Sequence, residues 1–400
     1  MKKNKKKEEQ ETMRANLTLL TAPLLAPLAM VLLAVELLCA SAPVTAAEQP
    51  KKVIYETDMC LDVDDVGGLA ILHAMADLGE AEILAVTFNE VHPSGAAAID
   101  AINTWYGRGG IPVGIYKGNL AAPDISKYLG PVAAFPHDLT RETAPTALEV
   151  YRKVLAAQPD KSVTIISVGF LNNLYDLLKA DPDLVGKKVK EMVVMGSRNH
   201  DGFNLSRHDT VAQSEFVIRN WPTPLVISSH GGGTKTGAKL SGAAAKNPVR
   251  EAYYQWFDQF YEGRSSWDQV AVLYGVRGLG NCFREITTGK GTLRNGFEWQ
   301  MQPGHRSYLE AKLSDQGFVD IIEPLMIKPP RKHLAAGIEW ADGSRGSAAA
   351  INLQAVEQWG LFETSFKAPP PCRFADGREV LRHIQNGRRK HHRAGLLGWR

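Results

Sequence analysis

Short apolar runs alternate with longer amphipathic stretches from residue 53 to about residue 328, and this alternation restricts the fold more than any other feature. The runs with the length and composition of strands are Val53–Tyr55, Ile83–Phe88, Ile111–Ile115, Val163–Ser167, Met192–Met195 and Leu225–Ser228. The stretches with helical periodicity are Val66–Leu78, Ala96–Tyr106, Ala147–Ala157, Leu171–Ala180 and Thr210–Arg219. This repetition predicts a Rossmann-like α/β fold, in which helices cover both faces of a mostly parallel sheet. Such folds bind ligands at the carboxyl ends of their strands.

Composition divides the 400-residue chain into three parts. Residues 1–47 begin with basic residues, continue through an apolar segment and end in small residues, which predicts a signal peptide and export to the periplasm or the extracellular space. Left uncleaved, the apolar segment is long enough to anchor the chain in a membrane. Residues 50–330 are predicted to form one catalytic domain. Residues 331–400 are rich in Gly, Ala, Pro and Arg; we interpret them as a separate tail, for which disorder remains an alternative.

Four aspartates lie within eight residues directly after the first predicted strand: Asp58, Asp62, Asp64 and Asp65. Carboxylates at this density repel one another unless a cation neutralises them, and oxygen ligands at a turn suit Ca²⁺ or Mg²⁺. A purely structural turn is the alternative, because Asp also favours turns and helix N-termini. Capping a helix does not require four carboxylates, so the sequence predicts a cation site at this turn. The net charge of +3 gives no indication of a nucleic-acid partner.

Two other acidic motifs can be tested by their spacing. An EF-hand loop beginning at Asp62 would need an oxygen ligand at Val66 and a glutamate at His73, so the spacing excludes it. A phosphohydrolase of the Asp-x-Asp type would place its nucleophilic carboxylate at Glu56, which disfavours that class without excluding it.

The acidic stretch and the order of the later segments resemble the inosine–uridine-preferring nucleoside hydrolase family over about residues 52–328. In that family an N-terminal strand is followed by Asp-x-Asp-Pro-Gly-x-Asp-Asp. Here the stretch reads Glu56-Thr-Asp58-Met-Cys-Leu-Asp62-Val-Asp64-Asp65, two residues longer, and is similar to a branch with an Asp-x-Asp-Asp variant. The resemblance implies Ca²⁺-dependent hydrolysis of a ribosyl N-glycosidic bond, in a nucleoside or a related small molecule. Family members are commonly oligomers, so a homo-oligomer is one expectation.

Carried over position by position, the resemblance implies four ligands for Ca²⁺: the carboxylates of Asp58, Asp65 and Asp268 and the backbone carbonyl of Val168. Asp58 is also the implied catalytic base, which takes a proton from a metal-bound water. The extra Asp62 leaves the register of the stretch open, and Asp62 is therefore an alternative ligand.

On the substrate side the resemblance implies contacts from Asp64, Asn89, Asn204 and Trp267. Asp64 would accept hydrogen bonds from sugar hydroxyls, and Asn204 matches the Asn of a Glu-Phe-Asn segment that grips the ribose. Two positions depart from the family pattern. Its Glu is Gly202 here, and its His is Trp267, which can stack on a base but cannot donate a proton at neutral pH. These departures motivate the alternative of a catalytically impaired, calcium-dependent sugar or nucleoside binding protein.

Other side chains are candidates to compensate for these departures. Asn199 and Asp201 lie close to Gly202 in the sequence, and His230 lies in a glycine-rich turn after the sixth predicted strand. A histidine in a loop is more often simply solvated.

Overall fold

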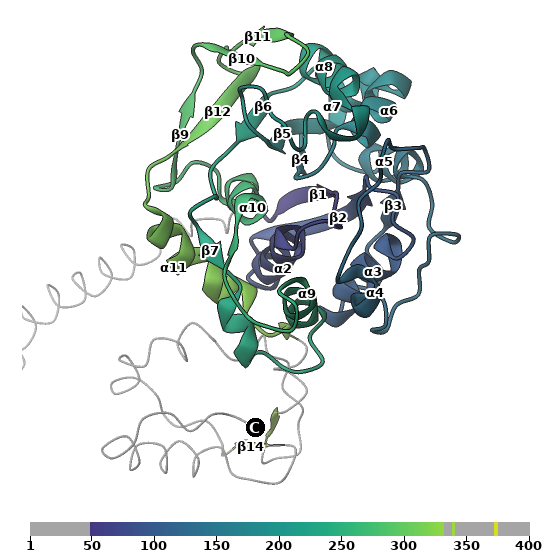
Figure 1. Cartoon of the computed structure of the whole chain (residues 1–400), viewed down its shortest axis with the longest axis vertical. Helices are drawn as coiled ribbons and strands as arrows, with labels where there is room; N and C mark the ends of the chain where they lie inside the picture. Colours follow the sequence, from purple (N-terminus) through teal and green to yellow (C-terminus); the bar gives the residue numbers. More distant parts are fainter. Residues whose placement is uncertain (1–48, 332–337, 341–371, 375–400) are drawn as a thin grey trace, which may run out of the picture. The chain divides into compact units, whose positions relative to one another are not determined.

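The computed structural model describes residues 49–331, 338–340 and 372–374, and its centre is an eight-stranded sheet (Figure 1). The strands, in spatial order, are β3 (Val113–Ile115), β2 (Ala81–Phe88), β1 (Lys51–Thr57), β4 (Val163–Ser167), β5 (Val189–Met195), β6 (Leu225–Ser228), β12 (Arg306–Ala311) and β9 (Phe283–Ile286). Neighbouring strands are parallel except β12 and β9. The predicted mostly parallel α/β sheet is confirmed.

Helices cover both faces of the sheet because its strands are apolar on both sides. Along β1, Val53 and Tyr55 belong to one core and Ile54 to the other, as the alternation of side chains in a strand requires. The first core includes residues of α2 (Asp64–Asp77), α3 (Gly95–Trp105), α4 (Leu129–Val132), α9 (Pro248–Trp256), α10 (Trp267–Arg277) and α11 (Asp315–Met326). The second includes residues of α5 (Ala147–Ala156), α6 (Asn172–Ala180), α7 (Pro182–Lys188) and α8 (Val211–Asn220).

Short elements connect these layers. Strand β7 (Lys235–Thr236) pairs with β8 (Arg264–Ser265), and β10 (Lys290–Thr292) pairs with β11 (Glu298–Gln300). Two short 3₁₀ helices in the described residues are η1 (Arg207–Asp209) and η2 (Ala238–Gly242). Strand β8 leads directly into α10, which begins near the predicted site. Helix η1 follows the loop after β5, a strand whose carboxyl end lies at the same edge of the sheet.

The element boundaries differ from the predictions in two instructive places. Strand β3 begins at Val113 and not at Ile111, because Pro112 has no N–H to donate to a sheet. Helix α2 begins at Asp64, two residues before the predicted start, and thereby places two carboxylates in its first turn. Negative charge is favourable there because the unpaired N–H groups of the first turn are electropositive.

The predicted leader, residues 1–47, lies outside the described residues, as does most of the predicted tail. Within the tail, β13 (Ile338–Trp340) pairs antiparallel with β14 (Cys372–Phe374). No helix in the described part of the chain is long and apolar enough to span a membrane.

Candidate metal centre

The acidic residues gather at the carboxyl ends of β1, β2 and β4. Asp58 directly follows β1 and is only 4% exposed, and Asn89, which follows β2, is fully buried. Gly169, just beyond β4, shows how closely these three strand ends approach. A Cβ on Gly169 would lie 2.5 Å from the backbone nitrogen of Asp58 and 2.7 Å from the side-chain amide of Asn89. Only glycine leaves room for this approach.

Helix α10 brings a distant carboxylate to the same place. Helices α2 and α10 pack against each other (Figure 1), and Asp268 lies in the first turn of α10. Its Cβ would be 3.3 Å from a Cβ built on Gly68 of α2. The structure thus brings Asp268 next to Asp64 and Asp65, which begin α2. The arrangement is favourable for each helix alone, because both place acidic residues in their first turns.

These carboxylates raise one another's pKa values. Burial raises the pKa of Asp58 to about 8, against the lowering effect of Arg207 and together with the charge of Asp62. Burial is also the largest cause of the raised pKa values of Asp65 and Asp268, and their carboxylate neighbours raise them further. Buried like charges of this kind are stable only when protonated or when a cation neutralises them.

Among the described residues, the three aspartates whose carboxylate oxygens lie within 4.8 Å of one another are Asp62, Asp64 and Asp65, and not the predicted set of Asp58, Asp65 and Asp268. Unpartnered oxygens also favour a cation here. The Oδ1 atoms of Asp64 and Asp268 are buried and have no hydrogen-bond partner among the described residues. The carboxylate of Asp65 accepts a bond from Thr57 Oγ1, and the Tyr55 hydroxyl donates to the Asp65 carbonyl over 2.9 Å. Asp65 is therefore held in place from two sides. Carboxylate oxygens without donors, on fixed elements, are suited to a hard divalent cation.

Two arginines contact the acidic residues, and the sequence patterns indicated neither. Arg264 of β8 places Nη2 2.7 Å from Asp62 Oδ2 and Nε 3.6 Å from Asp64 Oδ1. Its guanidinium lies 5.0 Å from the ring centre of Trp267 and 5.1 Å from that of Trp256. Asp62, the alternative metal ligand, is thus engaged in an ion pair, although its carboxylate stays within 4.8 Å of those of Asp64 and Asp65.

The second arginine contacts Asp58 itself. Nη2 of Arg207 lies 3.0 Å from Asp58 Oδ2 and 2.9 Å from Asp124 Oδ2. The guanidinium stacks on Phe203, 3.8 Å from the ring centre, and the side chain is 17% exposed. No local pattern could have indicated this residue, because η1 brings it to a carboxylate 149 positions away.

The remaining predicted residues lie around the same strand ends. Asn89 donates to the Phe170 carbonyl over 2.7 Å, and Asn204 donates to the carbonyl of Val168. A carbonyl has two lone pairs, so the predicted ligand Val168 still has one available. The Oδ1 atoms of both asparagines are buried without a hydrogen-bond partner in the described ranges. Each amide can therefore accept a bond from a ligand hydroxyl.

The two positions that depart from the family pattern have other partners. Gly202 lies against the guanidinium of Arg294, which occupies the space that a side chain would need. The carboxylate of Asp201 accepts bonds from the backbone of its own loop, from Ser197 N at 2.6 Å and from Phe203 N at 2.9 Å. The Asp201 carboxylate therefore holds its own loop, which makes it less available to replace the glutamate that is absent at Gly202.

His230 lies on the turn between β6 and β7, and Trp267 is the first residue of α10. His230 Nε2 is 3.2 Å from Asp315 Oδ1, and its ring packs on Phe318, so it is paired away from the aspartate cluster. Trp267 is half-buried beside Gly232 and Arg264.

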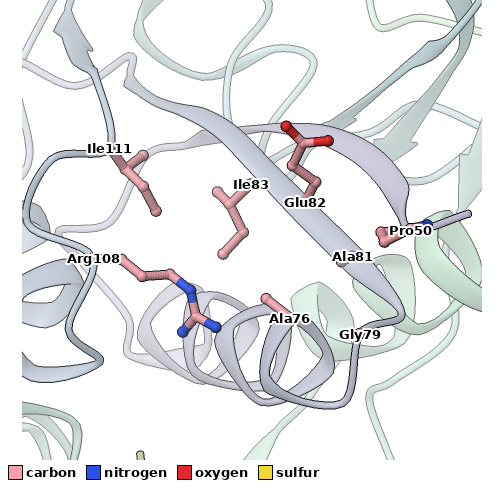
Figure 2. A pocket seen from close by; sticks show the side chains of 8 residues that line it. All are labelled: Pro50, Ala76, Gly79, Ala81, Glu82, Ile83, Arg108 and Ile111. Atoms are coloured by element: carbon pink, nitrogen blue, oxygen red, sulfur yellow. The ribbon is translucent and has the colours of Figure 1, made fainter. Parts of the chain in front are cut away.

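A cavity of about 360 Å³ lies at the other end of the strands (Figure 2). Its lining includes the residues that begin β2 and the end of α2, namely Ala81, Glu82 and Ala76. None of the clustered aspartates lines it, so it is separate from the chemistry described above.

Comparisons with known proteins agree on the fold. The sequence matches no protein-family model and no curated protein. The structure is similar to an inosine–guanosine nucleoside hydrolase, with a TM-score of 0.53 and 16% identity, over 69% of this chain and 98% of that one. It is similar to the inosine–uridine preferring nucleoside hydrolase of Bacillus anthracis, with a TM-score of 0.52 and 18% identity, over 69% and 99% of the two chains. It is also similar to the type III effector protein XopQ complexed with adenosine diphosphate ribose, with a TM-score of 0.52 and 12% identity, over 71% and 94%. The chain has a nucleoside hydrolase-like α/β fold, as the sequence predicted.

Proposed function

We propose that the protein is a metal-dependent hydrolase that cleaves the N-glycosidic bond of a nucleoside or a related ribosyl compound. The observation that supports this most is the group of buried carboxylates with unpartnered oxygens at the strand carboxyl ends, in a fold that nucleoside hydrolases share. Oxygen-only ligands favour Ca²⁺ as the cation.

The cation would be held by Asp58, Asp65, Asp268 and the Val168 carbonyl. When bound, it would lower the pKa of a coordinated water and fix the orientation of sugar hydroxyls. Cleavage passes through an oxocarbenium-like state, so an activated nucleophile and a clamped sugar both accelerate it. Asp58 accepts the proton of the attacking water, which its position at the end of β1 permits.

Other side chains hold the substrate in this proposal. Asp64 accepts hydrogen bonds from sugar hydroxyls through Oδ1, which receives no hydrogen bond from the described residues and lies 3.6 Å from Arg264 Nε, and Asn89 and Asn204 do the same with their amide oxygens. Trp267 stacks on the base. Since Trp267 cannot protonate the base, we expect substrates whose leaving group departs with little help from an acid.

A specific observation favours a second candidate, a ribosyl-compound binding protein without turnover. Arg207 pairs with Asp58, and its guanidinium makes Asp58 a weaker base than burial alone would make it. Gly202 and Trp267 remove two further groups that would assist catalysis. The structurally similar effector protein XopQ is complexed with adenosine diphosphate ribose.

One assay separates these candidates. The purified full chain is mixed with a panel of nucleosides, and released reducing sugar is measured with and without a chelator. Release that the chelator abolishes, and that Asp58→Asn loses, supports the hydrolase. The control Asp160→Asn changes an exposed aspartate that pairs with Lys188 and should release sugar like the wild type. Calorimetric binding without release would identify the binding protein, and phosphate release from phosphoesters alone would identify the Asp-x-Asp type of phosphohydrolase.

Three further features are proposed from the sequence alone: export through the leader, separation of the tail from the catalytic domain, and a homo-oligomer. The N-terminal residue of the mature protein, limited proteolysis and the mass in solution test them in turn.

A further inference from the structure

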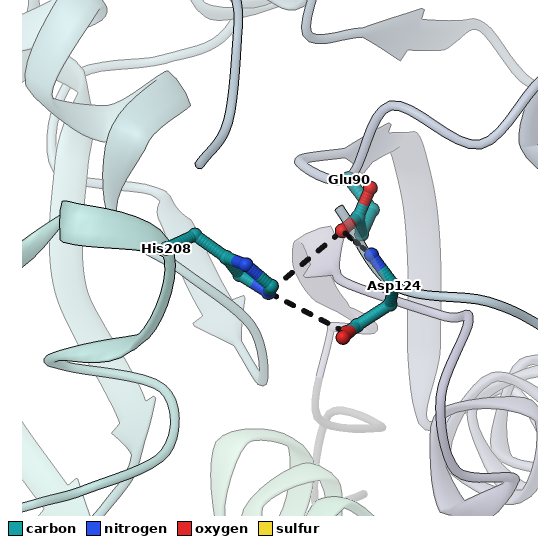
Figure 3. A group of neighbouring side chains, drawn as sticks. All are labelled: Glu90, Asp124 and His208. Atoms are coloured by element: carbon teal, nitrogen blue, oxygen red, sulfur yellow. Dashed lines mark hydrogen bonds and ion pairs between the residues drawn. The ribbon is translucent and has the colours of Figure 1, made fainter. Parts of the chain in front are cut away.

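A second group of ligand atoms lies beside the aspartate cluster. Glu90 follows Asn89 at the end of β2, Asp124 lies in the loop after β3, and His208 lies in η1. His208 Nε2 is 3.5 Å from Asp124 Oδ2 and 3.8 Å from Glu90 Oε1. Figure 3 shows the imidazole pointing toward both carboxylates. All three side chains are shielded from solvent: Glu90 is fully buried, and the side chains of His208 and Asp124 are 4% and 11% exposed.

The hydrogen bonds of His208 fix which ring nitrogen carries a proton. Nδ1 lies 2.8 Å from the carbonyl oxygen of Ala121, and a carbonyl only accepts, so Nδ1 is the donor. Nε2 is buried and has no hydrogen-bond partner in the described part of the chain. In the neutral ring, a lone pair on Nε2 therefore faces two carboxylate oxygens. Three electron-rich atoms in a shielded space favour a positive charge between them, in addition to the hydrogen bond that Glu90 Oε1 accepts from the Asp124 backbone N–H over 2.8 Å.

The arginines supply that charge only in part, because Arg207 Nη2 lies 2.9 Å from Asp124 Oδ2. Asp58, Asp62, Asp64, Asp65, Glu90, Asp124 and Asp268 form one acidic region, since the aspartates affect one another electrostatically and Glu90 accepts a hydrogen bond from the backbone of Asp124. Among the described arginines and lysines, only Arg207 and Arg264 form ion pairs with these seven carboxylates. One divalent cation at the aspartates would still leave three negative charges without a partner. One of these charges is that of Glu90, with which no described arginine or lysine forms an ion pair.

We propose that Glu90, Asp124 and His208 bind a second divalent cation, of the borderline class to which Zn²⁺, Mn²⁺ and Co²⁺ belong. One imidazole and two carboxylates are typical ligands for these ions, whereas the all-oxygen aspartate cluster suits Ca²⁺. Ligand atoms around a tetrahedral zinc with bonds of about 2.1 Å are roughly 3.4 Å apart, close to the distances from Nε2. The Ala121 carbonyl orients the imidazole as an outer partner of a metal-binding histidine does.

The proposed cation site would also explain an unfavourable backbone conformation in η1. His208 and the following Asp209 both have positive φ, 56° and 58°, which is unfavourable for residues other than glycine. A cation that joins His208 to the loop of Asp124 and to the end of β2 would hold η1 in this conformation. This inference does not depend on the proposed hydrolysis, because it concerns ligand atoms and not turnover.

The test is a Co²⁺ titration of the full chain after removal of metals, in excess Ca²⁺ to fill the aspartate cluster. We expect one equivalent of Co²⁺ to bind and to give the visible absorption of a nitrogen-ligated ion. His208→Asn removes the imidazole, and Asn tolerates the left-handed backbone at this position. We expect Co²⁺ to bind this variant more than about 100-fold more weakly, beyond what loss of an outer partner alone causes.

His230→Asn is the matched control, because it removes an imidazole that faces a carboxylate outside the cluster; it should bind Co²⁺ like the wild type. Asp124→Asn, which keeps the size of the side chain, should weaken binding as His208→Asn does. Thermal unfolding of each variant verifies that it is folded. Wild-type protein that binds no Co²⁺ in excess Ca²⁺ would overturn the proposal, whatever the variants do. Folded His208→Asn protein with unchanged Co²⁺ affinity would overturn it as well.

Discussion

The two sides of the candidate site are built differently. On one side, Asp58, Asp65 and Asp268 lie at the end of a central strand and in the first turns of two helices that pack together. On the other side, Phe203 and Arg207 lie on the loop and the single helical turn between β5 and α8. The first side is held by the core of the domain. The second is held by ion pairs, ring stacking and a backbone with left-handed residues.

This difference teaches which properties each side can set. Carboxylates on rigid elements fix the position of a cation, and a change of ligand there should affect binding strongly. Loop residues are replaced more easily and determine which molecule enters and how fast it reacts. One departure from the family pattern, Gly202, lies on the loop side, whereas the other, Trp267, begins α10 beside Asp268; the aspartates of the rigid side are retained.

The largest effect should come from the rigid side. Asp268→Asn removes one buried negative charge, so we expect Ca²⁺ affinity to fall by more than about 100-fold while the metal-free protein unfolds at a higher temperature than the wild type. Wild type in Ca²⁺ at about 100 times its dissociation constant should gain about 2.7 kcal/mol, and the variant should gain almost nothing. Thermal unfolding with and without Ca²⁺ measures both.

The control is Asp183→Asn, an exposed aspartate in the first turn of α7. It should keep the wild-type response to Ca²⁺. Equal stabilisation of Asp268→Asn and the wild type would contradict the assignment of Asp268 as a ligand.

A change on the loop side should raise the affinity for Ca²⁺ instead of lowering it. Arg207→Gln removes the cation that pairs with Asp58, so the carboxylates become more attractive to Ca²⁺ and we expect about tenfold tighter binding. Arg219→Gln, which breaks an exposed arginine–glutamate pair, is the matched control and should change nothing. Weaker Ca²⁺ binding in Arg207→Gln would show that Arg207 supports the metal side.

The pH dependence of stability and of Ca²⁺ affinity should reveal the charge state of the buried aspartates. Burial raises the pKa of Asp58 in the metal-free native state to about 8, whereas the same carboxyl in the unfolded state has its ordinary pKa near 4. Between these two pH values the native state therefore keeps a proton that the unfolded state has lost. Stability without metal should therefore fall as pH rises from about 4 to 8, and Ca²⁺ affinity should rise over the same window because protons compete with the ion. Unfolding temperatures in chelator at pH 5.5 and pH 8 check the sign. A higher unfolding temperature at pH 8 would show that another group dominates.

The smallest effect is expected where Trp267 would stack on the nucleobase of the substrate. Trp267→Phe keeps an aromatic face but reduces its area, so nucleoside binding should weaken by about 0.5–1.5 kcal/mol, whereas Ca²⁺ affinity should stay unchanged. Calorimetry with the nucleoside and with Ca²⁺ separates the two. Equal losses for both ligands would mean that Trp267 acts by positioning Asp268 and not by stacking.

The sequence predicted the regular part of the fold well because β1 to β6 are apolar runs in a repeating order. It did not predict β9 and β12, which extend the sheet beyond β6. Strand β12 contains Arg306, whose buried guanidinium donates to the carbonyls of Ile218 and Trp221. A charged residue interrupts an apolar pattern, and its compensating carbonyls lie some 85 residues away.

The same reason limited the prediction of the site. The aspartates after β1 stand together in the sequence, so their shared chemistry was visible. Arg207, Arg264 and His208 are single residues in loops, and their partners become neighbours only in the folded chain. The metal side could therefore be proposed from local density of charge, whereas the loop side needed three-dimensional contacts.

The proposal that Asp58, Asp65 and the distant Asp268 bind one cation is tested most directly by anomalous diffraction from crystals of the full chain grown with Ca²⁺ or Mn²⁺. We predict one peak 2.0–2.6 Å from carboxylate oxygens of Asp58, Asp65 and Asp268 together, the range of bond lengths for such ions. Crystals without a peak at this place, or with an ion bound only through Asp62, would contradict the account.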